Sequence, residues 1–164
     1  MRLASALLDR FGAGEGRGEV IRLGLPDHCL TIIDESYNAN PASMRAALDS
    51  FAQRPAESGR RILVLGDMLE LGAHAAGLHK GLAAAVEAAK ADLVFLVGPE
   101  MRALAEALGE AGVARWAHGA EDIEDAVLMA LALGDTVMIK GSNGVRLSSL
   151  VARIRREFGE SAAS

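Results

Sequence analysis

The sequence predicts an α/β domain with an open, mainly parallel, six-stranded sheet and helices on both of its faces. Six short apolar runs alternate with segments in which apolar residues recur at helical spacing. The connections between them are short, which favours right-handed crossovers between parallel strands. Just over half of the chain (51%) is hydrophobic and only 4% is aromatic, so aliphatic side chains must build the core.

The expected elements follow one another in a regular order. Pro41 after Asn40 predicts the start of a helix, because Pro is tolerated at the first helical position and Asn is a good N-cap. The run 61–65 is apolar at every position after Arg61, which is typical of a strand covered on both faces. The expected strands are 20–25, 30–33, 61–65, 93–97, 113–116 and 136–139. The expected helices are 3–11, 41–52, 75–90, 100–111, 120–133 and 145–158.

A glycine-rich stretch marks the first boundary. Residues 12–18 (GAGEGRG) hold four glycines in seven positions, which is typical of a linker or of a loop that passes close to another group. The spacing fits neither the dinucleotide fingerprint nor a P-loop. We therefore expect 1–17 to be the end of a preceding domain with its linker, 18–160 to be the α/β domain, and 161–164 to be a frayed tail.

Composition limits the partners of the chain. A net charge of -5 disfavours nucleic acid, and Arg153, Arg155 and Arg156 are interpreted as one solvated helix face. The single cysteine, Cys29, rules out an internal disulfide. No apolar stretch reaches the ~20 residues needed to span a bilayer, and the first residues lack a secretory signal. We expect a cytoplasmic monomer that binds neither nucleic acid nor membrane.

Three polar loops follow expected strands, where open sheets of this class bind their ligands. The first contains Asp34, Glu35, Asn38 and Asn40, more hydrogen-bonding capacity than one helix cap requires. A turn with an elaborate N-cap is the alternative interpretation.

The other two loops pair acidic and cationic groups with glycines. In 66–72, Asp67 and Glu70 flank a Met-Leu pair, although two carboxylates alone are a weak indication of a metal. His74 and His79 are five residues apart and do not share a helix face, as a zinc-binding pair would. A lone histidine is usually exposed or caps a helix, and we expect this of His79. In 140–144, Lys140 precedes a glycine-rich turn at a helix N-terminus, which favours a bound carboxylate or phosphate. A plain turn capped by Ser142 or Asn143 is the alternative.

Five stretches share their residues and their order with one known family. They are 15–18 (EGRG), 34–44 (DESYNANPASM), 63–72 (LVLGDMLELG) with His79, 97–99 (VGP) and 140–143 (KGSN). Together they make the chain similar to the C-terminal domain of the Mur ligases, over nearly its whole length. The stretches 34–44 and 63–72 are the most specific, and they resemble the branch that adds D-alanyl-D-alanine.

The resemblance implies a Rossmann-like domain of an enzyme with three domains. Such an enzyme uses ATP and Mg²⁺ to join D-alanyl-D-alanine to UDP-N-acetylmuramoyl-tripeptide during peptidoglycan precursor synthesis. The N-terminal domain and the central P-loop domain would be separate from this chain. The chain alone would then be inactive, hold no catalytic or metal-binding residue, and bind no cofactor tightly.

The resemblance also implies roles for individual residues. Arg17 resembles an arginine that contacts the ATP phosphates or ribose. Glu35, with Asp34 as the alternative, resembles the acid that holds the ribose hydroxyls. The residues implied for ATP are Arg17, Asp34, Glu35, Asn38 and Asn40. Those implied for the dipeptide are Tyr37, Asp67, Glu70, Lys140, Ser142 and Asn143.

Three other interpretations stay open. The first is a stand-alone module that binds a small anion. The second is the equivalent domain of a sister Mur or folylpolyglutamate-type ligase, and the third is an interaction domain without a ligand. The stretch 37–41 (YNANP) argues against the sister ligases. A helix followed by a glycine-rich linker argues against the stand-alone module.

Overall fold

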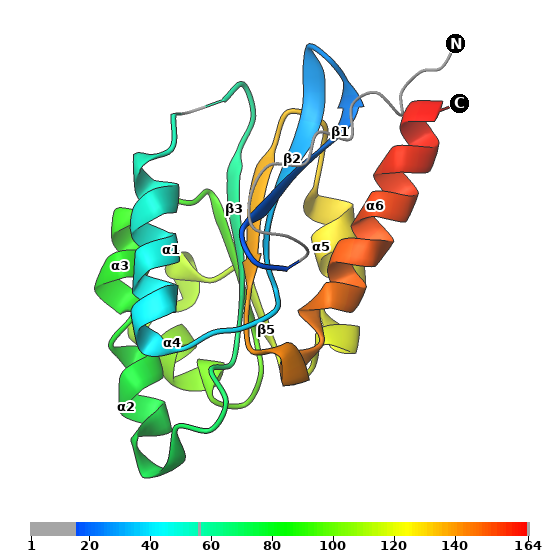
Figure 1. The fold of residues 1–164 in the computed structure, drawn as a ribbon. Coiled ribbons are helices and arrows are strands. Elements are labelled where there is room, and N and C mark those ends of the chain that lie inside the picture. Colours follow the sequence, from blue (N-terminus) through cyan, green and yellow to red (C-terminus); the bar gives the residue numbers. More distant parts are fainter. Residues whose placement is uncertain (1–15, 56, 164) are drawn as a thin grey trace.

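The computed structural model describes residues 16–55 and 57–163. It contains one six-stranded sheet in the order β1-β2-β6-β3-β4-β5, flanked on both faces by helices (Figure 1). β1 pairs with β2 in antiparallel fashion, and every other pair in the sheet is parallel. The predicted fold class is therefore confirmed. The expected helix 3–11 and most of the glycine-rich stretch lie outside the described residues.

All six expected strands form, each within about two residues of its predicted bounds. They are β1 (Glu19–Leu25), β2 (His28–Glu35), β3 (Arg61–Gly66), β4 (Leu93–Val97), β5 (Arg115–Ala117) and β6 (Thr136–Lys140). The α-helices are α1 (Pro41–Gln53), α2 (Ala75–Lys80), α3 (Ala83–Ala88), α4 (Met101–Leu108), α5 (Glu124–Ala130) and α6 (Leu147–Ala163). Short 3-10 turns are η2 (Gly72–His74), η3 (Glu110–Gly112), η4 (Ala120–Asp122) and η5 (Asn143–Val145).

The predicted helix 75–90 is wrong, because the chain breaks into α2 and α3 at Gly81 and Leu82. The carbonyl oxygen of Gly81 accepts a hydrogen bond from the Arg45 guanidinium (3.2 Å), and Leu82 N donates to His79 O in a tighter turn (3.1 Å). A contact with a residue in α1 therefore interrupts a segment whose composition favours one helix.

The other helices differ from the prediction at their ends. α4 ends at Leu108 because Gly109 adopts a φ of 77°, which terminates a helix. α5 ends at Ala130, since Asp135 accepts a hydrogen bond from Ala132 N (2.9 Å). α6 runs to Ala163, beyond the expected end at residue 158.

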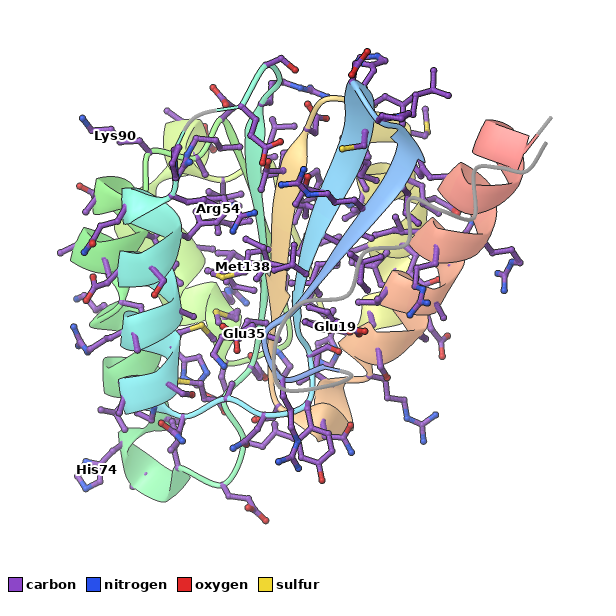
Figure 2. The ribbon with its side chains drawn as sticks, turned by 45° about the horizontal axis from the view of Figure 1, so that its top comes forward. Glu19, Glu35, Arg54, His74, Lys90 and Met138 are labelled. Atoms are coloured by element: carbon purple, nitrogen blue, oxygen red, sulfur yellow. The ribbon has the colours of Figure 1, made fainter. Side chains whose placement is uncertain are left out.

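The sheet separates two apolar cores. α1, α2, α3 and α4 lie on one side of it and α5 and α6 on the other (Figure 1). The first core joins Met44, Phe51 and Leu104 to one face of the sheet, and Met138 of β6 points into it (Figure 2). The second joins Ile154 and the other buried residues of α5 and α6 to the opposite face. Among the described residues no helix is long and apolar enough to cross a membrane.

Candidate functional site

The loops after β2, β3, β4 and β6 meet at one edge of the sheet, as the rule for open sheets predicts. Parallel pairing aligns the last residues of β2 and β6, so that Glu35 lies opposite Lys140. Asp67 N donates to Val97 O (3.0 Å), and Ser142 N donates to Asp67 O (3.0 Å). These bonds join three loops into one surface.

A cleft of about 410 Å³ opens at this edge, and we call it the Arg17 cleft. The Arg17 guanidinium stacks over the Tyr37 ring, 3.9 Å from its centroid, and both side chains are exposed. The cleft is lined by Gly16, Arg17, Glu35, Tyr37, Asn38, Ser43 and Lys140. It thus brings together the cationic, acidic and amide groups of two of the predicted loops.

Lys140 forms the buried side of the Arg17 cleft and is only 3% exposed. Its Nζ donates to Asn38 O (2.9 Å) and lies 3.9 Å from Oε1 of Glu35. Burial lowers the pKa of the Lys140 ammonium, and the Glu35 carboxylate acts in the opposite direction. The predicted dipeptide residue Lys140 therefore sits with predicted ATP residues.

Asp34 holds the turn that presents Arg17. Its carboxylate is buried and accepts hydrogen bonds from Gly16 N (3.1 Å), Ser36 N (3.0 Å) and Ser36 Oγ (2.6 Å). Tyr37 N in turn donates to Gly16 O (2.9 Å). These contacts fix the two chain segments on which the stacked Arg17 and Tyr37 are carried.

Asn40 is the N-cap of α1, as its place before Pro41 predicts. Its Oδ1 accepts from Ser43 N (2.8 Å), and Ser43 Oγ accepts from Asn40 N (3.0 Å). This reciprocal capping box satisfies two N–H groups at the helix start.

Asp67 is buried and binds the N-terminus of α4. Its Oδ1 accepts from Met101 N (2.8 Å) and its Oδ2 accepts from Glu100 N (3.2 Å). Burial raises the pKa of the Asp67 carboxyl, while the two peptide N–H bonds oppose the shift. Gly98 allows this contact, because a Cβ there would lie 2.3 Å from Asp67 Cγ.

The second predicted loop, 66–72, begins at the last residue of β3, and we call its residues 67–72 the Glu70 loop. Met68 N donates to His79 Nε2 (2.9 Å), and Leu69 N donates to Ser142 Oγ (2.9 Å). Ser142 Oγ itself donates to Ala39 O (3.3 Å). Glu70 is exposed and adopts a φ of 65°, a conformation that is uncommon for a residue other than glycine.

The expectation that His79 is exposed or capping is wrong, because its side chain is completely buried. A signal for this was present in the helical spacing. In a continuous helix Ala75, Leu82 and Val86 would share a face with His79, and all of them are buried. His74, by contrast, is exposed on the outer surface of η2 and points away from the sheet (Figure 2).

The predicted site residues therefore divide by exposure. Asp34, Asp67, Lys140 and Ser142 are buried and engaged with neighbouring backbone groups. Arg17, Tyr37, Asn38, Asn40, Glu70 and Asn143 are exposed, and Glu35 is half-buried. Within 16–55 and 57–163, no group of three or more His, Cys, Asp or Glu side chains is placed to hold a metal ion.

Comparison with known proteins identifies the family. The family described as "Mur ligase, glutamate ligase domain" matches residues 16–143, well over half of the chain. The chain belongs to the Mur ligase family. The predicted resemblance is thus confirmed.

Two curated Mur ligases illustrate the similarity, and both are named UDP-N-acetylmuramoyl-tripeptide--D-alanyl-D-alanine ligase. The protein of Bacillus subtilis (strain 168) is 38% identical over 128 residues, covering 76% of this chain and 28% of the relative. The protein of Escherichia coli (strain K12) is 31% identical over 159 residues, covering 92% of this chain and 33% of the relative. The chain therefore spans about a third of the length of these relatives.

Solved Mur ligase structures share the fold. The MurF ligase of Thermotoga maritima in complex with ADP matches 93% of this chain with a TM-score of 0.71 and 23% identity. A MurF structure from Acinetobacter baumannii matches 88% with a TM-score of 0.74 and 25% identity. The chain covers 33% and 31% of those two proteins.

Proposed function

We propose that the chain is the C-terminal domain of an ATP-dependent ligase that joins D-alanyl-D-alanine to UDP-N-acetylmuramoyl-tripeptide. The product is a cytoplasmic precursor of peptidoglycan, and hence of the cell wall. The names of relatives that match up to 92% of this chain support this proposal. The observation that supports it most directly is the Arg17 cleft, where an exposed guanidinium, a carboxylate and a buried ammonium meet at the ligand-binding edge.

The Arg17 cleft suits one side of a nucleotide. Arg17 supplies a planar cation for phosphate or ribose oxygens, and the half-buried Glu35 carboxylate accepts from ribose hydroxyls. Asn38 adds an exposed amide that can both donate and accept. Asp34 and Asn40 act on ATP indirectly in this proposal, because their side chains already hold the turn and the helix start.

The exposed residues of the neighbouring loops suit a zwitterionic dipeptide. Glu70 is the acceptor that we assign to its ammonium group, and Asn143 with the turn that follows it faces its carboxylate. Tyr37 offers an exposed ring at the Arg17 cleft. The pocket is supported by three buried side chains whose polar atoms are bound to backbone groups: Asp67, Lys140 and Ser142.

In the complete reaction ATP converts the terminal carboxylate of the tripeptide to an acyl phosphate, and the amine of the dipeptide then displaces phosphate. The described residues bind and orient the reactants. We assign no Mg²⁺ ligand to them, since they lack a suitable group of donors. We therefore expect the isolated chain to have no ligase activity and to need the two other domains as its partners.

Amide NMR spectra of the labelled chain test this proposal. ATP should shift the signals of Arg17, Glu35 and Asn38, and Arg17→Ala should abolish that response. Arg102→Ala serves as a matched control, because Arg102 is an exposed arginine of α4 paired with Glu106. Partial sites bind near ~1 mM, about 4 kcal/mol, so the titration must go well above that concentration.

The dipeptide provides the second arm of the same experiment. D-alanyl-D-alanine should shift Glu70 and Asn143, whereas L-alanyl-L-alanine should not. Equal shifts with both isomers would contradict a pocket built for the D-dipeptide. A response to inorganic phosphate equal to that for ATP would favour the stand-alone anion-binding module.

A further inference from the structure

His79 contacts two chain segments through its two ring nitrogens. Its Nδ1 lies 2.6 Å from Ala75 O, one turn earlier in α2, and its Nε2 lies 2.9 Å from Met68 N. A carbonyl oxygen only accepts and a peptide N–H only donates, so Nδ1 carries the proton and Nε2 accepts. The two contacts therefore require a neutral imidazole in the Nδ1–H tautomer.

The Glu70 loop is held at three successive peptide groups. Asp67 N donates to Val97 O of β4 (3.0 Å), Met68 N to His79, and Leu69 N to Ser142 Oγ (2.9 Å). Val97 ends β4, His79 lies in α2 and Ser142 lies in the loop after β6, so three separate parts of the fold hold the loop. Glu70 comes next, with a φ of 65°. Such a conformation persists only where the surroundings hold it, because it costs about 1–3 kcal/mol.

Met68 makes His79 the critical partner of the three. Met68 is only 1% exposed, so its N–H group has no ready access to water if the imidazole is removed. A buried donor without an acceptor is unfavourable, and the loop would have to move to hydrate it. The direction of Glu70 depends on that same segment of backbone.

We propose that His79 is a positioning residue of the ligand-binding edge. Its neutral imidazole sets the conformation of residues 68–70 and thereby presents Glu70 to the ammonium group of a D-alanyl dipeptide. The contact with the dipeptide rests on the proposed function. The effect on the Glu70 loop does not, so the two parts can fail separately.

Two substitutions test the role of the imidazole. His79→Gln keeps an acceptor for Met68 N and a donor for Ala75 O, whereas His79→Leu keeps the volume and removes both. Leu82→Ala is the matched control, because Leu82 is completely buried beside the same helix break and is apolar. It lowers stability without removing a polar contact of the Glu70 loop.

The first readout is the imidazole itself. Nitrogen NMR of the unmodified chain should show His79 with a protonated Nδ1 and an unprotonated Nε2. The opposite tautomer would overturn the proposal, and this measurement does not depend on whether any variant folds.

The second readout is the Glu70 loop. His79→Leu should speed amide exchange at Met68, Leu69 and Glu70 and weaken D-alanyl-D-alanine binding about tenfold, equivalent to ~1.4 kcal/mol. ATP-induced shifts in the Arg17 cleft should persist. His79→Gln should restore both properties, and Leu82→Ala should leave both unchanged. An unchanged rate of amide exchange at Glu70 in His79→Leu would refute the positioning role. Faster exchange there, with no dipeptide binding by the unmodified chain or by any variant, would refute the proposed substrate alone.

Discussion

Replacing Asp67 by alanine tests whether its carboxylate stabilises α4. The substitution removes the acceptors of Met101 N (2.8 Å) and Glu100 N (3.2 Å) at the helix start. Loss of a side-chain cap costs about 0.5–2 kcal/mol, and loss of a negative charge near a helix N-terminus adds about 0.3–1 kcal/mol. Burial of the carboxylate is unfavourable, however, as the raised pKa of Asp67 indicates, and the alanine variant regains that part.

The net expected loss for Asp67→Ala is about 1–2 kcal/mol in the free energy of unfolding. In a domain of this size each kcal/mol lowers Tm by about 2–4 °C, so thermal unfolding should shift by about 2–8 °C. Circular dichroism during heating measures this change. Asp49→Ala is the control, because Asp49 is an exposed acid on α1 and its removal should change stability by less than about 0.5 kcal/mol.

Gly98 provides a second, independent test of the same contact. Gly98→Ala introduces a Cβ 2.3 Å from Asp67 Cγ and imposes a φ of 116° on a residue with a side chain. In the Asp67→Ala background the atoms that clash are gone and only the backbone strain, about 1–3 kcal/mol, remains. The double variant should therefore be more stable than the sum of the single changes predicts, by about 1–2 kcal/mol. Strict additivity, or an Asp67→Ala variant as stable as Asp49→Ala, would refute the assignment of Asp67 as the cap of α4.

Two further changes address the loops on either side of the Arg17 cleft. Asn40→Ala removes the capping box with Ser43 and should lower the free energy of unfolding by about 0.5–2 kcal/mol, measured as a lower urea midpoint with an unchanged slope. Burial lowers the pKa of Lys140 below its ordinary 10.5, so the folded chain releases this proton at a lower pH than the unfolded chain. Stability should then rise with pH between the lowered pKa and 10.5. Lys140→Met should remove that rise in urea titrations at alkaline pH, and an unchanged pH profile would contradict the cause assigned to the shift.

The strands and the edge at which their polar loops meet were predictable because they depend on local patterns. The run 61–65 is apolar at every position after Arg61 and is followed directly by Gly66, so both the strand and its end are visible in the sequence. Parallel pairing then places all such ends at one edge. The cap at Asn40 was equally visible, because its partner Ser43 is only three residues away.

The roles of the buried polar residues were not predictable, since their partners are remote in the sequence. The resemblance implies that Asp67 contacts the dipeptide. Its carboxylate instead accepts hydrogen bonds from Glu100 N and Met101 N, 33 and 34 positions later in the sequence, which the pairing of β3 with β4 brings close. Lys140 meets Asn38 O across 102 positions for a similar reason. The break between α2 and α3 depends on Arg45, 36 positions from Gly81. In each case the register of two strands or the packing of two helices decides the contact.

The division between buried and exposed polar groups limits which side chains can contact the proposed ligands at this edge. Asp34, Asp67 and Ser142 cannot turn toward a ligand without leaving peptide N–H groups unpaired, at about 1–3 kcal/mol each. In the proposed function, direct contacts with ATP and the dipeptide must therefore come from exposed groups such as Arg17 and Glu70. Exposed groups bind charged ligands weakly while water competes for them, and the same contacts become stronger once a second surface excludes that water. We therefore expect tight binding only when other domains of the proposed ligase cover the edge, whereas the buried groups keep it in shape beforehand.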